Sequence, residues 1–387
     1  MRGDRTHRKA FAFRYYRRKH ARTRSHRKLC GITLILPLKR RLFMAFLYVL
    51  LAILLFGALI FIHELGHFLT ARLFHVTVHE FSIGMGPRLL WFTSKKSGTV
   101  YALRLFPIGG FVSMAGEDEK SDDENAISAK PLWQRMIITA AGSFSNLLLG
   151  FIVVGIIVFS MKSIYAPVIS DFTENAITSA EGGLEVGDKI IRVGPRRVYT
   201  ASDVVYAIGR YGDETTEVTV IRGGEKKMLT VTFPTYENQG IKFGSRDFNF
   251  KEENRNFFSL MRYTWHQSVM VVRVIWDSLF DLVTGKLGLK QLSGPVGITK
   301  EIASVAQSGD KANLLSIFAM LAVNLGVMNL LPFPALDGGR LFFMFIELIF
   351  RKPIKPEVEG YIHFVGIIIL LGLMVLVAFK DIAYLFK

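Results

Sequence analysis

Two histidines and a glutamate stand at the end of a long apolar run, in the pattern H-E-x-x-H formed by His63, Glu64 and His67. In a helix, residues four apart share a face, so both imidazoles can reach one metal ion. The glutamate beside them can then act as a general base on water. Cys30, the only cysteine, lies in the N-terminal tail, which leaves His, Asp and Glu as ligands. The spacing therefore predicts a zinc hydrolase site.

The apolar run that carries this motif sets the site inside a membrane. Residues 42–62 include no charged side chain and are long enough to cross a bilayer as a helix. Ionisable groups within a span cost about 3 kcal/mol each on insertion scales, so they mark functional positions. The alternative to a hydrolase is a set of polar residues that line a transport path without catalysis. The motif favours the hydrolase.

A zinc hydrolase site needs a third protein ligand, which this helix does not supply. The stretch 329–338, N-L-L-P-F-P-A-L-D-G, ends another apolar run and contains two prolines that break a helix. Non-helical backbone at membrane depth is tolerated only where protein buries it or where it lines a wet cavity. Asp337 in this segment is therefore the candidate third ligand. The alternative is that Asp337 caps a helix that begins near Gly339.

Four stretches have the length and hydropathy of membrane spans, at residues 42–69, 136–161, 312–331 and 361–379. The first connecting loop contains two β-rich runs, 89–93 and 99–106, and Pro107, Gly109 and Gly110 are expected to end the second. Charged residues interrupt the amphipathic stretch 257–287, which predicts a membrane-surface or protein-packing helix. The apolar stretch 341–350 is too short to span and is expected to be buried or interfacial.

Charge is concentrated at the N-terminus. Residues 1–43 carry 15 Lys and Arg against one acid, Asp4, in a chain of net charge +16. Such a tail predicts a disordered arm for anionic lipid or, more weakly, for nucleic acid. Lys and Arg in the first and third connecting loops place those loops in the cytoplasm and the soluble segment between spans two and three outside. The basic tail opposes this orientation, and a translation start at Met44 would reconcile the two.

The H-E-x-x-H motif and the stretch 329–338 together resemble the site-2 protease family of intramembrane zinc metalloproteases. The likeness is greatest to its bacterial branch, which performs regulated intramembrane proteolysis. The resemblance implies that His63, His67 and Asp337 bind zinc, and that Glu64 activates the attacking water as general base. Further matches are F-S-I-G-M-G-P at 81–87, P-I-G-G-F-V at 107–112 and S-G-P-V-G-I at 293–298.

The resemblance implies further site residues on two spans. The family's glycine motif of the second span is G-S-F-S-N at 142–146, where Ser143 replaces a common proline and leaves the local helix shape open. Asn146 of this motif, with Asn324 and Asn329 of the third span, is expected to bind the substrate. Interhelical hydrogen bonding is the alternative for Asn324.

The implied fold is a polytopic α-helical membrane protein of about four transmembrane helices, with a membrane-associated β-hairpin and one α/β PDZ domain. The hairpin could add a strand from an unwound substrate helix or merely cover the site. The PDZ pattern begins with S-A-E-G-G-L-E-V-G-D-K-I-I at 179–191, and its role in peptide binding or steric gating stays open. The expected division is a tail at 1–43, the first two spans at 44–161, the PDZ domain at 166–237, an amphipathic linker at 238–311 and the last two spans at 312–387.

The implied function is cleavage of transmembrane segments in single-span membrane proteins, after an upstream site-1-type protease has made the first cut. Anti-sigma factors, signal-peptide remnants and pheromone precursors are substrate classes of the family, and nucleic acid is not expected as a partner. The alternative is a non-proteolytic membrane scaffold or transporter with structural zinc. Glu64 separates the two, because a structural zinc site needs no general base.

Overall fold

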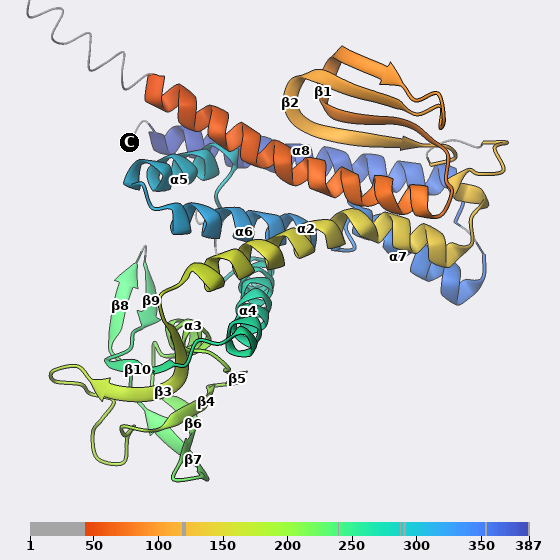
Figure 1. Ribbon diagram of the computed structural model, residues 1–387. Coiled ribbons are helices and arrows are strands. Elements are labelled where there is room, and N and C mark those ends of the chain that lie inside the picture. Colours follow the sequence, from red (N-terminus) through yellow and green to blue (C-terminus); the bar gives the residue numbers. More distant parts are fainter. Residues whose placement is uncertain are drawn as a thin grey trace, which may run out of the picture.

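A computed structural model describes residues 43–117, 121–238, 240–286, 288, 292–352 and 354–385. Nearly all of the expected basic tail, and Cys30 within it, lies outside these residues. Among the described residues four helices are long and apolar enough to cross a membrane, which confirms the expected number of spans. They are the first helix (Phe43–Leu73), α2 (Leu132–Ser160), α6 (Lys311–Asn329) and α8 (Pro356–Leu385). The first helix begins where the grey trace ends in Figure 1.

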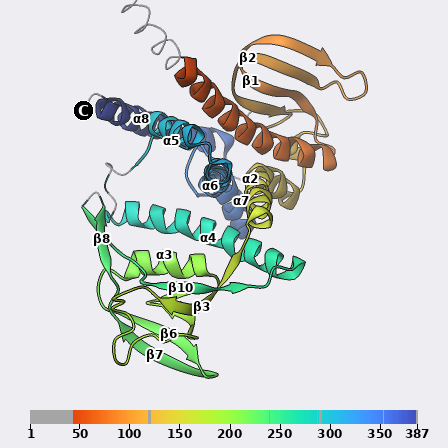
Figure 2. The same ribbon diagram turned by 60° about the vertical axis from the view of Figure 1, so that its left-hand side comes forward.

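Helix α2 lies at the centre of the membrane helices (Figures 1 and 2). It packs against α6, α4 (Phe257–Val283) and α7 (Asp337–Phe350). Small residues permit these approaches, as is common between membrane helices. A Cβ at Gly150 would lie 2.4 Å from Val323 of α6, and one at Gly326 would lie 2.9 Å from Leu147 of α2. The short helix α5 (Pro295–Ser308) is anchored to α8. Asp381 of α8 accepts hydrogen bonds from the backbone amides of Gly294 and Gly297 at the start of α5.

The loop after the first helix folds into a long hairpin of β1 (Val78–Thr93) and β2 (Val100–Met114). The expectation that Pro107, Gly109 and Gly110 end the second strand is wrong, because β2 continues through them. Glycines with left-handed backbone, such as Gly84 (φ 85°) and Gly109 (φ 84°), let the strands bend while pairing continues. The hairpin therefore curls on itself, and Ile83 of β1 is opposite residues from both halves of β2.

A buried carboxylate holds this curled hairpin together. Glu80 accepts hydrogen bonds from Arg88 (2.5 Å), Arg104 (2.7 Å) and Ser82 (3.0 Å). Burial by itself raises the pKa of Glu80, but the hydrogen bonds from Arg104, Arg88 and Ser82 outweigh it, so the pKa is lowered from its ordinary value. The carboxylate stays ionised at neutral pH and joins residues from the two strands.

Between α2 and α4 the chain forms a sheet domain with strand order β10-β3-β4-β6-β7. Within it, β6 (Thr216–Arg222) pairs antiparallel with β7 (Glu225–Val231). The sheet extends past the expected boundary at residue 237, because β10 pairs antiparallel with β3. The elements are β3 (Ile164–Phe172), β4 (Lys189–Val193), β5 (Arg196–Arg197), α3 (Ala201–Tyr211), β6 (Thr216–Arg222), β7 (Glu225–Val231), β8 (Thr235–Asn238), β9 (Ile241–Gly244) and β10 (Phe248–Glu253).

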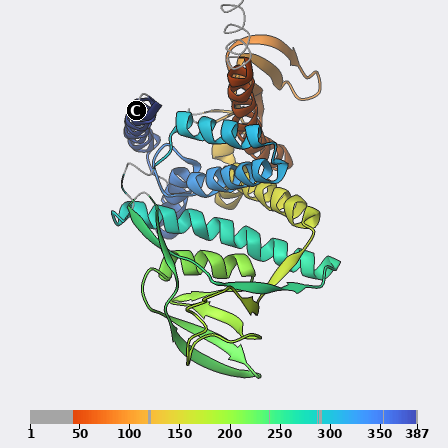
Figure 3. The same ribbon diagram turned by 90° about the vertical axis from the view of Figure 1, so that its left-hand side faces the viewer.

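The amphipathic stretch of the sequence is α4, which lies between the sheet domain and the membrane helices (Figures 2 and 3). Towards the membrane helices, Ile275 packs into an apolar cluster with residues of α6. Towards the sheet domain, Asp277 lies 2.9 Å from Arg196, and Asp281 receives two hydrogen bonds from Arg210 at 2.5 and 2.7 Å. We call these four charged residues the α4 clasp. It fixes the sheet domain to a helix that itself contacts α2 and α6.

Asp281→Ala should loosen the sheet domain, because it leaves the Arg210 guanidinium part-buried without its two-point partner. We expect a loss of about 1–3 kcal/mol, as for a hydrogen bond to a charged group. The measurement is thermal unfolding in detergent together with amide exchange of α3 peptides. Glu214→Ala, which removes an exposed carboxylate of the same domain, is the control. Equal unfolding temperatures and equal amide-exchange rates in the wild type, Asp281→Ala and Glu214→Ala would mean that the α4 clasp does not stabilise the sheet domain.

Candidate active site

His63 and His67 meet Asp337, which lies 270 positions after His67 in the sequence, inside the helix bundle. The two histidine Nε2 atoms lie 3.2 Å apart. The Oδ2 atom of Asp337 lies 3.1 Å from Nε2 of His63 and 3.3 Å from Nε2 of His67. Both imidazoles are buried and Asp337 is half-buried. Among the described residues, this is the single group of three His, Cys, Asp or Glu that could hold a metal ion.

The spacing of these three atoms fits zinc. In a tetrahedral site with bonds of about 2.0–2.1 Å, two ligand atoms lie about 3.3 Å apart. The observed triangle of 3.1, 3.2 and 3.3 Å has nearly this size. Two imidazoles and one carboxylate, with no thiolate, form a donor set that leaves a fourth position for water. The residues present therefore fit a catalytic zinc ion.

Helix α2 contacts both imidazoles at Nδ1, the ring nitrogen that does not face the candidate metal position. The Nδ1 atom of His67 lies 2.8 Å from the backbone oxygen of Ile138, which can accept a hydrogen bond from it. The side-chain amide of the fully buried Asn146 lies 3.3 Å from Nδ1 of His63, and its own Oδ1 has no partner among the described residues. With the amide oxygen and nitrogen exchanged, Oδ1 would accept a hydrogen bond from the N–H at Nδ1 of His63. Each ring would then turn Nε2 towards the metal position.

The approach of α2 depends on a glycine. A Cβ atom at Gly142 would lie 2.3 Å from Nε2 of His67 and 2.8 Å from Nε2 of His63. Ser143, which stands where the resemblance expects a proline, is fully buried in the uninterrupted helix. Its Oγ lies 3.5 Å from Oδ2 of Asp337, so this position faces the third ligand.

The candidate third ligand, Asp337, comes from the start of α7. That helix begins at Asp337 itself after Leu336, and its N-cap forms no side-chain hydrogen bond. The alternative that Asp337 caps a helix beginning near Gly339 is therefore wrong, because the carboxylate faces the histidines instead. The proline-containing turn after α6 brings it there, as the broken helix at 329–338 suggests.

Glu64 lies beside the ligand cluster and against the hairpin. It is half-buried, and the backbone amide of Val112 in β2 is within hydrogen-bonding reach of its carboxylate. A Cβ at Gly110 would lie 3.4 Å from Cγ of Glu64, in ordinary contact. The inner end of β2 thus forms one wall of the site.

The structure separates the three candidate asparagines. Asn146 lies against His63, and Nδ2 of Asn329 lies 3.5 Å from Nε2 of the same histidine. Asn324 is half-buried on α6, and among the described residues no hydrogen bond joins it to either histidine. Sequence reasoning missed His363 of α8, whose Nδ1 accepts a hydrogen bond from the backbone amide of Ala335 at 2.9 Å. A histidine within an apolar span was the available signal.

Gly142→Ala should remove zinc, because its methyl group would occupy space needed by both imidazoles. We expect a loss of zinc affinity of at least about tenfold, the lower limit for disturbed ligand orientation. Zinc content of the purified protein is the measurement. Gly155→Ala on the same helix is the matched control, since its Cβ would meet only one methyl carbon of Thr264, at 3.5 Å. Equal zinc content in both variants would exclude the proposed fit.

Comparisons with known proteins agree with this site. Residues 51–373 match the model of peptidase family M50. A chain of Clostridium perfringens whose name places it among zinc metalloproteases is 36% identical over 346 residues, covering 87% of this chain and 99% of that relative. The regulator of sigma-W protease RasP of Bacillus subtilis is 31% identical over 417 residues, covering 86% and 98%. Zinc metalloprotease RasP of Geobacillus kaustophilus is 31% identical over 416 residues, covering 86% and 97%.

The family match covers most of the chain, including both ligand-bearing segments. Two of these relatives are zinc metalloproteases by name, and the similarity extends over nearly the whole length of all three. The two findings together show that this chain is a zinc metalloprotease. The chain belongs to peptidase family M50, the site-2 protease family, and is a zinc metalloprotease of the membrane.

Proposed function

We propose that this protease cleaves peptide bonds within the membrane, in the transmembrane segments of single-span proteins. One observation carries the proposal: the candidate metal ligands lie among the membrane-spanning helices. His63 and His67 lie on the first helix, and Asp337 lies at the start of α7, after the turn that follows α6. A peptide bond must therefore enter the bundle to reach these residues.

The residue roles follow from their positions. We assign His63, His67 and Asp337 as zinc ligands and Glu64 as the general base. Zinc, when bound, makes a water molecule more acidic and polarises the scissile carbonyl. Glu64 accepts a proton from the attacking water and delivers it to the leaving amide nitrogen. The products are a new carboxyl terminus and a new amino terminus.

Substrate must be extended at the site, because a helix shields its own peptide bonds. The inner end of β2, which contacts Glu64 through Gly110 and Val112, is placed to pair with such a segment. Asn329 remains the proposed substrate contact, since its Nδ2 lies 3.5 Å from Nε2 of His63, beside the candidate metal position. We reassign Asn146 to orienting His63, and the position of Asn324 supports a role within the helix bundle.

We interpret the sheet domain as a PDZ domain on the extracytoplasmic side, where the positive-inside rule places it. Its attachment through the α4 clasp holds it beside α2 and α6, next to the ends of two spans. A bulky outer domain on a substrate would collide with it. An upstream site-1-type protease must then trim the substrate first. The name of the Bacillus subtilis relative points to regulators of a sigma factor as one substrate class.

Glu64→Gln should abolish cleavage and retain zinc, because it removes the base and leaves the ligands. His67→Ala and Asp337→Ala should lose both. The measurements are zinc content and cleavage of a single-span reporter protein in proteoliposomes, analysed on gels. Expected turnover of the glutamine variant is lower by about 10²–10⁴-fold, the usual contribution of a general base. Turnover at the wild-type rate would exclude Glu64 as the base.

Deleting the sheet domain at 164–253 should relax the requirement for a trimmed substrate. The intact enzyme should cut the reporter only after its outer domain is removed, whereas the deletion variant should cut both forms. Glu64→Gln in the deletion background controls for other proteases. If the deletion variant cuts trimmed reporter but still rejects the untrimmed form, steric gating by this domain is excluded.

A further inference from the structure

We propose that α8 positions the third zinc ligand through two residues, His363 and Gly366. They lie three positions apart on one face of the helix and contact the turn that leads to Asp337. The inference rests on the proposed assignment of Asp337 as a ligand. Helix α8 supplies no ligand itself, so its role would be that of a brace.

The turn between α6 and α7 has a backbone that its own sequence does not favour. Ala335, two residues before Asp337, has a φ of 78°. A residue with a Cβ rarely adopts this left-handed conformation, and it persists only where surrounding groups impose it. The position of Asp337 is therefore set in part by whatever holds Ala335.

His363 supplies one of these holding contacts. The backbone N–H of Ala335 donates to Nδ1 of His363 over 2.9 Å. On the far side of the ring, Nε2 lies 3.7 Å from a carboxylate oxygen of Glu359. That negative charge favours the tautomer with its proton on Nε2, which leaves the Nδ1 lone pair free to accept. The ring of Phe343 on α7 packs edge-on against His363, with ring centres 5.7 Å apart.

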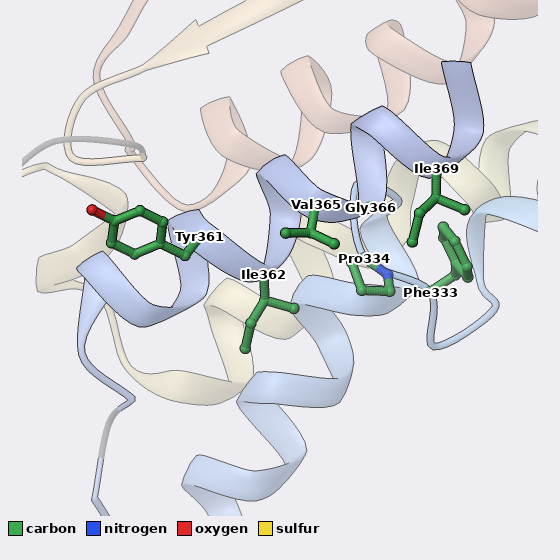
Figure 4. A pocket seen from close by; sticks show the side chains of 7 residues that line it. All are labelled: Phe333, Pro334, Tyr361, Ile362, Val365, Gly366 and Ile369. Carbon is green, nitrogen blue, oxygen red and sulfur yellow. The ribbon is translucent and has the colours of Figure 1, made fainter. Parts of the chain in front are cut away.

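Gly366 supplies the second contact. A Cβ there would lie 2.5 Å from Cβ of Pro334 and 2.6 Å from its backbone oxygen. Figure 4 shows Pro334 directly beside Gly366, where Phe333 and Ile369 also border the apolar groove between the turn and α8. The helix backbone thus touches the turn itself. Any side chain at position 366 would push Pro334, and with it Asp337, away from α8.

The two ends of the zinc site are then held by different helices. Helix α2 orients the histidines through Ile138 and Asn146. Helix α8 holds the aspartate turn through His363 and Gly366. The two histidines and the aspartate are therefore correctly placed together only when both α2 and α8 are packed in position.

The test compares variants of the full-length enzyme in detergent, with zinc affinity measured by competition with a chelator. His363→Phe removes the acceptor, whereas His363→Asn offers an amide oxygen near the position of Nδ1. Gly366→Ala introduces the clash. Gly372→Ala and Gly360→Ala are matched controls on the same helix, because a Cβ at either position meets no atom within 4 Å.

We expect His363→Phe and Gly366→Ala to weaken zinc binding by about 10–100-fold, the range seen when groups that orient ligands are lost. At saturating zinc, kcat for the trimmed reporter should fall while KM stays unchanged. His363→Asn should restore most of the zinc affinity lost in His363→Phe, and both control glycine variants should match the wild type. Absorption of the cobalt-substituted protein should change in His363→Phe and Gly366→Ala alone, because coordination by Asp337 is altered.

Two results would overturn the inference. One is wild-type zinc affinity and cobalt absorption in both His363→Phe and Gly366→Ala. The other is equal zinc affinity in His363→Asn and His363→Phe. Asp337→Ala separates this failure from failure of the site assignment. If Asp337→Ala binds zinc as tightly as the wild type, Asp337 is not a ligand; if it loses zinc while the α8 variants retain it, only the brace is excluded.

Discussion

The close contact between the first helix and α2 is the interaction on which the site depends. Gly66 faces α2 and Gly142 faces the first helix, and a Cβ at either would lie 2.3 Å from an atom across the interface. Without side chains at these points, the helices come near enough for α2 to reach the outer nitrogens of both imidazoles. In a membrane, where lipid is as apolar as any side chain, such close packing is a main source of helix association. The same contact therefore stabilises the bundle and orients two ligands.

Local patterns in the sequence were sufficient to predict the four spans and to select His63, His67 and Asp337 as candidate ligands, which the structure brings together. The spacing of His63 and His67 fixes their shared face, and long apolar runs mark the four spans. Two prolines before Asp337 indicate the broken helix that delivers it. Each of these signals acts within one helix or one turn, where periodicity and backbone sterics decide the structure.

Contacts between distant segments could not be predicted in the same way. Pro107 and Gly109 resemble a strand end locally, but β1 pairs along both sides of the bend and keeps β2 extended. The pairing of β10 with β3 enlarges the sheet domain beyond residue 237. The local sequence of neither strand predicts which strand it pairs with. Ile138 acts through its backbone oxygen, which carries no signal of residue type. His363 is visible as a polar residue in a span, but its contact with Ala335 depends on tertiary packing.

Few elements connect the sheet domain to the buried site. The α4 clasp holds the sheet domain, α4 packs on α2 and α6, and those helices carry Asn146 and Asn329 beside His63. The hairpin approaches from the other side and places β2 against Glu64. The candidate metal ligands, Glu64 and the inner end of β2 thus meet in one place inside the protein.

X-ray absorption at the zinc edge of the purified enzyme identifies the atoms around the metal without any substrate, and so tests whether His63, His67 and Asp337 bind it. We expect about four nitrogen and oxygen neighbours near 2.0 Å, with multiple scattering from two imidazoles. A sulfur neighbour near 2.3 Å, or a shell with fewer than two imidazoles, would contradict a site built from His63, His67 and Asp337.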